Sequence, residues 1–233
     1  MLEQYVYKAL NLQSLEDITA IGTDETSLKK GHNYISLFVD LVAKKTLFVT
    51  EGKDHNTVTD FVEFLTEQGG KADNIQDVSC DMSPAFIKGV QEQLPNAQIT
   101  FDKFHILKII NEAVDQVRRE EAKTEPLLKK ARYVFLKNEQ NLTKKQQDKK
   151  ESLSKLNLKS MRALHLRENF QAIYAAETLD EFESLLKKWY FWASHCRLEP
   201  MKKVAKTIKN HWDGILRWKE SQINNGILEG LCP

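Results

Sequence analysis

The first third of the chain alternates apolar and polar positions with a period of two residues. The clearest case is residues 33–40, where Ile35, Leu37 and Val39 alternate with the side chains between them. This period is typical of a strand whose two faces have different surroundings. After a short helical lead-in over residues 1–19, three consecutive strands are therefore predicted to form an antiparallel meander: residues 18–25, 33–40 and 46–51.

After the meander, the spacing of apolar residues changes to that of a helix. Val58, Phe61, Val62 and Leu65 follow the i, i+3, i+4, i+7 pattern of an amphipathic helix, which a Gly-Gly pair ends. Two strand–helix pairs follow, with strands at residues 75–80 and 99–101 and helices over residues 86–94 and 107–117. Because parallel strands joined through helices need right-handed crossovers, this order predicts an α/β fold. Its mixed five-stranded sheet is flanked by helices, and its first and fourth strands are neighbours.

Strand patterns end near residue 120, and the rest of the chain is predicted to be helical. A Thr178-x-x-Glu181 capping box marks the start of one of these helices. The polar residues 138–151 form either the tip of a helix pair or a mobile loop. The predicted helices are residues 124–138, 143–156, 160–176, 179–195 and 200–219. We therefore divide the chain into a core (1–119), a long all-helical insertion (120–219) and a final segment (220–233).

Aromatic residues gather in the helical part. Helix packing accounts for such a cluster more readily than a platform on which nucleic-acid bases stack, although both remain open. The cluster consists of Trp189, Tyr190, Phe191, Trp192, Trp212 and Trp218.

Composition indicates a globular protein without a membrane segment. The 233 residues are 41% hydrophobic, which is enough for a sizeable core, and no apolar run is long enough to cross a membrane. The N-terminus lacks the basic and apolar regions of a signal peptide, so we expect a cytoplasmic protein. Three widely spaced cysteines argue against both a disulfide framework and a zinc ribbon.

The formal net charge of +1 conceals an asymmetry along the chain. Residues 1–101 carry 8 Lys and Arg against 15 Asp and Glu, whereas residues 102–219 carry 26 against 16. An acidic part that could hold metal, followed by a basic part, suits a protein that acts on a polyanion. A solvated helical surface rich in lysine explains the same numbers, so charge alone does not decide between the two.

Two aspartates stand at predicted strand ends. Asp81 follows the fourth strand, and Ser83 and Pro84 after it suit the N-cap and first position of a helix. Asp24 has a similar setting in the first strand, which is the predicted neighbour of the fourth. Two adjacent carboxylates are a natural start for a site that holds two Mg²⁺ ions roughly 3.5–4 Å apart. Glu229 is the third candidate ligand.

Six short motifs in this order resemble the DDE transposases of bacterial insertion sequences, in the ISL-three family. The resemblance extends from residue 18 to residue 230 and implies a ribonuclease H-like fold with a helical insertion before the last acidic residue. The motifs are residues 21–25 (IGTDE), 30–34 (KGHNY), 81–83 (DMS), 94–97 (LPNA), 101–105 (FDKFH) and 225–230 (NGILEG).

The resemblance also implies residue roles. Asp24, Asp81 and Glu229 would be the catalytic triad, holding two Mg²⁺ or Mn²⁺ ions that cleave DNA at the element's ends and join it to target DNA. Asp102 and His105 match an auxiliary Asp-x-x-His signature, in which His105 either orients a phosphate or is a plain structural histidine. The family implies a homo-oligomer in the active complex and a place on the bacterial nucleoid, away from membranes.

The sequence departs from the family at both ends. The family's N-terminal zinc-binding and helix-turn-helix region is not seen, and the chain reads Leu231-Cys232-Pro233 where the family continues into a basic helix. Two alternatives therefore stay open, an active catalytic domain and an inactive truncated copy. A non-catalytic DNA-binding or dimerisation remnant is a further alternative. A plain ribonuclease H-type nuclease is disfavoured by the long helical insertion.

Overall fold

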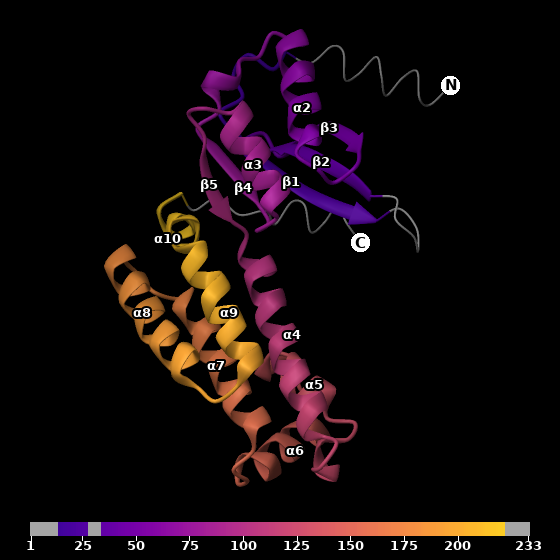
Figure 1. Ribbon diagram of the computed structural model, residues 1–233, viewed down its shortest axis with the longest axis vertical. Helices are drawn as coiled ribbons and strands as arrows, with labels where there is room; N and C mark the ends of the chain where they lie inside the picture. The colour runs from indigo at the N-terminus through magenta and orange to yellow at the C-terminus, as the bar shows by residue number, and fades with distance from the viewer. Residues whose placement is uncertain (1–13, 28–33, 222–233) are drawn as a thin grey trace. The chain divides into compact units, whose positions relative to one another are not determined.

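The computed structural model describes residues 14–27 and 34–221 (Figure 1). The chain divides into two compact units. We call residues 1–103 with 213–233 the sheet unit, and residues 104–212 the helical unit.

The sheet unit contains a mixed five-stranded sheet in the order β3-β2-β1-β4-β5. β1 pairs antiparallel with β2, β2 antiparallel with β3, and β4 runs parallel to both β1 and β5. The strands are β1 (Ala20–Ser27), β2 (Tyr34–Asp40), β3 (Lys45–Glu51), β4 (Asp77–Cys80) and β5 (Gln98–Phe101). The predicted sheet and the adjacency of its first and fourth strands are confirmed, and the sheet is compatible with a ribonuclease H-like fold.

The turn between β2 and β3 shows how local chemistry fixes the strand ends. Asp40 is buried, and its Oδ1 accepts hydrogen bonds from the backbone N–H groups of Val42 (2.8 Å) and Ala43 (2.9 Å). Lys44 then adopts a φ of 58°, in the left-handed region. A carboxylate that bonds the backbone two and three residues on is a strong turn former, so β2 stops here.

Two helices pack together in the sheet unit, α2 (Asn56–Glu67) and α3 (Pro84–Gln93) (Figure 1). The ring of Phe61 on α2 stacks on Phe38 of β2, with centroids 4.5 Å apart. A Cβ on Gly89 of α3 would lie 2.8 Å from Val58 Cγ2 on α2, so only glycine allows this approach. A short 3-10 turn, η1 (Ala72–Asn74), precedes β4.

The helix α10 (Trp212–Ser221) returns the chain to the sheet unit from residue 213 onward. A Cβ on Gly214 would lie 2.5 Å from the ring of Phe101, so the helix backbone lies directly against β5. Arg217 Nη2 donates to Asp77 Oδ1 at 2.8 Å, which ties the same helix to β4. Residues far apart in sequence therefore complete one packed unit.

The helical unit contains residues 104–121 of α4 (Lys103–Glu121) and no strand among its residues 104–212, all of which are described. Buried residues on α4 include Ile110, Val114 and Val117, as predicted. The other elements are η2 (Pro126–Leu128), α5 (Arg132–Leu136), η3 (Glu139–Asn141), α6 (Lys144–Ser154), α7 (Lys159–Ile173), α8 (Leu179–His195) and α9 (Glu199–Asn210).

Several predicted helices are confirmed and two are not. The helix predicted over residues 179–195 has the predicted ends. The predicted helix over residues 124–138 is wrong, because Pro126 opens a short 3-10 turn and Lys130 adopts a φ of 59°. The predicted helix over residues 200–219 is two helices, divided at His211, whose φ is −118°.

The aromatic cluster divides between core and surface. Trp189 is buried against Phe170, with ring centroids 4.8 Å apart, and its Nε1 donates to the Leu166 carbonyl at 2.7 Å. Phe191 and Trp192 are 58% and 52% exposed. Helix packing, the favoured prediction, is confirmed for Trp189 and wrong for these two residues.

A carboxylate on α4 caps the N-terminus of α7. Leu158, the N-cap residue, has no side-chain hydrogen bond to offer. Glu121 instead accepts the N–H groups of Lys159 (2.8 Å) and Ser160 (2.7 Å), together with the Ser160 hydroxyl (2.6 Å). Unpaired N–H groups and the helix dipole both favour a carboxylate at this place.

Other predictions have mixed outcomes. Residues 14–19, the described part of the predicted lead-in helix, form a turn and no helix. Cys80 and Cys196 are free thiols, and Cys232 lies outside the described residues. In the described ranges, no helix is long and apolar enough to span a membrane.

Candidate active site

The parallel pairing of β1 with β4 relates the positions of Asp24 and Asp81 along the strand direction. Ala20 pairs with Asp77, and two positions further on Gly22 pairs with Ser79. Continued by two more residues, this register puts Asp24 level with Asp81. Adjacent strands lie about 4.8 Å apart, and residues at one level project from the same face. The register is thus consistent with the predicted closeness of Asp24 and Asp81, which stays a prediction because the observed pairs end at Gly22 and Ser79.

Asp81 is held by the turn that joins β4 to α3. Its Oδ1 accepts the Ser83 N–H at 2.8 Å, while its Oδ2 has no protein donor among the described residues. Ser83 is the N-cap residue and Pro84 the first helical residue, as predicted, although the Ser83 side chain makes no capping bond. The half-buried carboxylate is therefore oriented through one oxygen.

Asp24 lies within β1 and is also half-buried. Its Oδ1 accepts the N–H of the next residue, Glu25, at 2.8 Å. Both candidate ligands therefore share a pattern, in which one carboxylate oxygen bonds a nearby backbone N–H. In each residue this bond fixes the orientation of the carboxylate group.

Asp102, the residue after β5, is a third carboxylate that the strand register aligns with Asp24 and Asp81. Val78 pairs with Ile99 and Cys80 with Phe101, so the next position puts Asp102 level with Asp81. Asp102 is only 3% exposed, and its N–H donates to the Cys80 carbonyl at 3.1 Å. Continued in this way, the registers align Asp24, within β1, with Asp81 and Asp102, each of which lies one residue past the end of its strand.

His105, the second member of the predicted auxiliary pair, lies in the first turn of α4. The side chain is half-buried. Its predicted role, orienting a phosphate or supporting the site wall, stays a prediction.

Cys80 lies directly beside Asp81 but has the properties of a core residue. Its side chain is fully buried, and this burial, with a smaller contribution from the Asp81 charge, raises the pKa of the thiol far above its usual range. A protonated, inaccessible thiol is neither a nucleophile nor a metal ligand. Cys80 is therefore not a candidate for the chemistry of this site.

The third predicted ligand, Glu229, lies outside the described residues. Within residues 14–27 and 34–221, no group of three His, Cys, Asp or Glu side chains could hold a metal ion. The donor chemistry of Asp24 and Asp81 nevertheless fits Mg²⁺ or Mn²⁺, which prefer carboxylate oxygens and retain several waters. The described residues thus supply two of the three predicted ligands.

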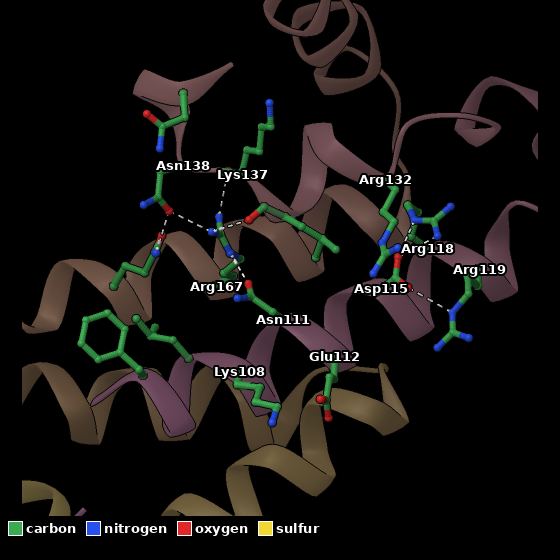
Figure 2. Close-up of a pocket in the computed structure, with 15 residues that line it drawn as sticks. Lys108, Asn111, Glu112, Asp115, Arg118, Arg119, Arg132, Lys137, Asn138 and Arg167 are labelled. Atoms are coloured by element: carbon green, nitrogen blue, oxygen red, sulfur yellow. Dashed lines mark hydrogen bonds and ion pairs between the residues drawn. The ribbon is translucent and has the colours of Figure 1, made fainter. Parts of the chain in front are cut away.

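Reasoning from the sequence missed a basic pocket in the helical unit. The pocket measures about 860 Å³, and Arg167 on α7 forms part of its wall (Figure 2). Arg167 is only 3% exposed, although it is charged. The excess of lysine and arginine after residue 101 was the available signal, but it did not indicate where these charges converge.

Comparison with known proteins identifies relatives along nearly the whole chain. A family profile described as "Transposase", of the DDE type in the ISL-three group, matches residues 21–232. The transposase for insertion sequence element IS1001 of Bordetella parapertussis is 27% identical over 222 residues, which cover 92% of this chain and 54% of the relative. The transposase for insertion sequence element IS1557 of Mycobacterium tuberculosis is 28% identical over 243 residues, covering 92% and 53%.

The chain spans about half the length of these curated relatives. The family profile, by contrast, covers the chain from the first strand almost to its last residue. It includes all the residues predicted as catalytic or auxiliary: Asp24, Asp81, Asp102, His105 and Glu229. The chain belongs to the DDE transposase family of the ISL-three type.

Proposed function

We propose that this chain carries the catalytic carboxylates of a DDE transposase. It cleaves DNA at the ends of an insertion sequence and joins the freed 3′-hydroxyl to target DNA. Membership of the transposase family supports DNA cleavage and strand transfer as the reaction class.

The observation that carries this proposal is the register between β1 and β4. The pairing of Gly22 with Ser79, continued by two residues on both strands, supports a site in which Asp24 and Asp81 lie close together. Parallel strands deliver their carboxyl ends to the same edge of a sheet, where α/β proteins bind their ligands. A site there needs no rearrangement of the sheet to bring its first two ligands together.

In this proposal, Asp24, Asp81 and Glu229 hold two Mg²⁺ or Mn²⁺ ions. Such ions activate a water or hydroxyl nucleophile and stabilise the leaving oxygen in phosphoryl transfer. The Ser83 N–H keeps the Asp81 carboxylate in one orientation, leaving Oδ2 to face the ligand. Asp102, with its buried carboxylate, and His105 act as auxiliary groups that support the wall of the site.

The proposal also covers the helical insertion, the oligomeric state and the cellular location of the protein. Residues 104–212 are a helical insertion within the ribonuclease H-like sheet unit, since the chain returns to that unit at residue 213. The active complex is a homo-oligomer that binds the transposon ends and the target. It works in the bacterial cytoplasm, on the nucleoid.

The test combines metal binding with DNA cleavage, using the full 233-residue chain. Mn²⁺ binding is followed by electron paramagnetic resonance, and cleavage on a plasmid that carries the element's own ends. Asp81→Asn should weaken Mn²⁺ binding and lower metal-dependent cleavage about 100-fold or more, because loss of a direct ligand exceeds the roughly 10–100-fold cost of losing an outer-shell partner. The matched control is Asp60→Asn, an exposed acid on α2.

Equal losses in Asp60→Asn, or metal-dependent cleavage that survives Asp81→Asn, would overturn the assigned site.

One alternative function has an observation in its favour, since the basic pocket of the helical unit suits a non-catalytic DNA-binding remnant. That alternative predicts DNA binding with no cleavage and no Mn²⁺ site in the unaltered chain. Mn²⁺ binding that depends on Asp81 separates the two functions even if cleavage is absent.

A further inference from the structure

The basic pocket of the helical unit has an elongated wall along α4. From Phe104 to Arg119 the lining follows this helix for a rise of about 22 Å, at 1.5 Å per residue. Six cationic side chains line the pocket, against two acidic ones, Glu112 and Asp115. The six are Lys108, Arg118, Arg119, Arg132, Lys137 and Arg167.

Arg167 is a buried cation whose bonding partners are all neutral. Its Nε donates to Asn111 Oδ1 at 2.6 Å, and its Nη2 to Asn138 Oδ1 at 3.0 Å (Figure 2). Backbone carbonyls accept two more bonds, from Nη2 to Leu136 (3.1 Å) and from Nη1 to Lys137 (3.4 Å). A guanidinium has five N–H groups, so one on Nη1 remains for a ligand.

No carboxylate within the described residues hydrogen-bonds Arg167. The nearby Glu168 raises its pKa, but burial has the larger effect and lowers it. Glu168 itself binds Lys150 at 2.7 Å. Buried charges in proteins are normally paired or neutralised, because desolvation is costly. Arg167 thus gives the pocket wall a positive charge that no carboxylate of the described residues neutralises by a hydrogen bond.

The rim supplies cations that are not already neutralised. Lys108 on α4 and Arg132 on α5 are exposed and make no ion pair in the described part of the chain. Asp115 binds both Arg118 (2.6 Å) and Arg119 (3.2 Å), so this trio keeps one positive charge. Glu112 is the one acidic residue of the lining that makes no ion pair within the described residues, so its negative charge opposes the binding of an anion.

The excess of cationic over acidic side chains is found in this pocket and not in the neighbouring hollow. A second hollow in the same unit, of about 590 Å³, is lined by four carboxylates, on Glu139, Asp148, Glu151 and Glu168, and by only two lysines, Lys144 and Lys150. A lysine-rich helical surface with evenly spread charge would not give adjacent hollows of opposite sign. The excess of cations around Arg167 therefore distinguishes this pocket from the neighbouring hollow.

We propose that this pocket binds consecutive phosphates of a DNA strand, with Arg167 beneath one phosphate and Lys108 and Arg132 beside its neighbours. Guanidinium groups match phosphate geometry and are held here before the ligand arrives. A wall of about 22 Å corresponds to roughly six nucleotides at 3.4 Å each, so it suits a strand better than a single phosphate ion. The choice of DNA rests on the proposed transposase function.

The test neutralises the two rim cations and leaves the buried network intact. Lys108→Gln/Arg132→Gln is compared with Lys188→Gln/Lys206→Gln, which removes two exposed lysines of the same unit that lie outside the pocket. Binding of the full chain to a labelled 30-base-pair duplex is followed by fluorescence anisotropy across a salt series, with EDTA present. Losing two phosphate contacts should lower the magnitude of the slope of log K against log salt by about 1.8, and affinity at 0.15 M salt about 30-fold.

The control pair should change affinity less than about threefold. Equal losses in the two double variants would overturn the proposal, as would unchanged binding in the pocket variant. Inorganic phosphate and poly-glutamate are titrated as competitors. Binding of inorganic phosphate at the pocket without DNA binding would mean a small-anion site only, and poly-glutamate binding as tight as that of DNA would mean an acidic protein partner; either result overturns the proposal.

Different experimental results would contradict the DNA-binding pocket and the transposase function. Because EDTA removes the metal, the duplex titration reports on phosphate contacts and is independent of the proposed metal site. Normal Asp81-dependent Mn²⁺ binding with unchanged DNA affinity in the pocket variant would overturn the pocket alone. Pocket-dependent DNA binding without any Mn²⁺ site would overturn the catalytic function alone.

Discussion

In the sheet unit, Asp24 and Asp81 are half-buried, and each bonds a backbone N–H within two residues of itself. In the helical unit, Arg167 is almost fully buried, and its partners Asn111 and Asn138 stand 56 and 29 residues away. The first pair is placed by the register of the main chain, whereas the guanidinium is placed by side-chain packing. The same chain thus positions an acidic and a basic surface by different physical means.

Placement by side-chain packing and placement by main-chain register should differ in their effect on stability, and the largest effect is expected for Arg167→Met. It removes a buried cation and leaves four accepting oxygens with one donor fewer, so unfolding should become easier by about 2 kcal/mol, measured by chemical denaturation. Asp81→Asn, which affects a half-buried carboxylate with one backbone bond, should cost less than about 1 kcal/mol.

Arg119→Met is the control for the loss of an arginine. Its side chain is 67% exposed and its bond to Asp115 is a surface ion pair, so the expected change is within about 0.5 kcal/mol. If Arg119→Met and Arg167→Met destabilise the protein equally, or if Asp81→Asn costs more than Arg167→Met, the charged groups of the two units are not positioned by different means.

An intermediate effect is expected at the α7 N-terminus. Glu121→Ala leaves the Lys159 and Ser160 N–H groups and the Ser160 hydroxyl without their acceptor. Loss of a helix cap typically costs about 1–2 kcal/mol, and the denaturation midpoint measures it. Glu120→Ala, which removes an exposed acid bonded only to Gln116 among the described residues, should change the midpoint little. A comparable shift in both variants would mean that Glu121 acts through net charge alone.

The contrast between the units explains what could be predicted from sequence. Period-two patterns and crossover rules are local or topological, so the sheet order and the adjacency of β1 and β4 follow from them. That adjacency is enough to predict that Asp24 and Asp81 lie close together, without knowledge of any side-chain contact. Arg167 offered no such signal, because a charged residue among apolar helix positions reads as exposed until its distant partners are known.

The predicted helices failed where local backbone chemistry overrides the apolar pattern. The 124–138 prediction ignored Pro126, which opens a 3-10 turn, and could not foresee the positive φ of Lys130. The 200–219 prediction ran through His211, where no glycine or proline marks the break. Apolar spacing therefore identified the helical character of this region, but not the turns that shape its pocket.

The smallest effect is expected at His211 itself, where α9 ends. Burial lowers the pKa of His211 below its usual value of about 6.5, so folding favours the neutral ring. The unfolded chain takes up the proton first as pH falls, and the stability present above pH 6.5 is lost progressively toward the lower pKa of the folded state. The melting temperature of the unaltered protein should therefore fall more steeply between pH 7 and pH 5 than that of His211→Gln. His165→Gln, at an exposed position on α7, should keep the original slope. Parallel curves for the unaltered protein and His211→Gln would show that burial of His211 has no influence on how the helical unit responds to acid.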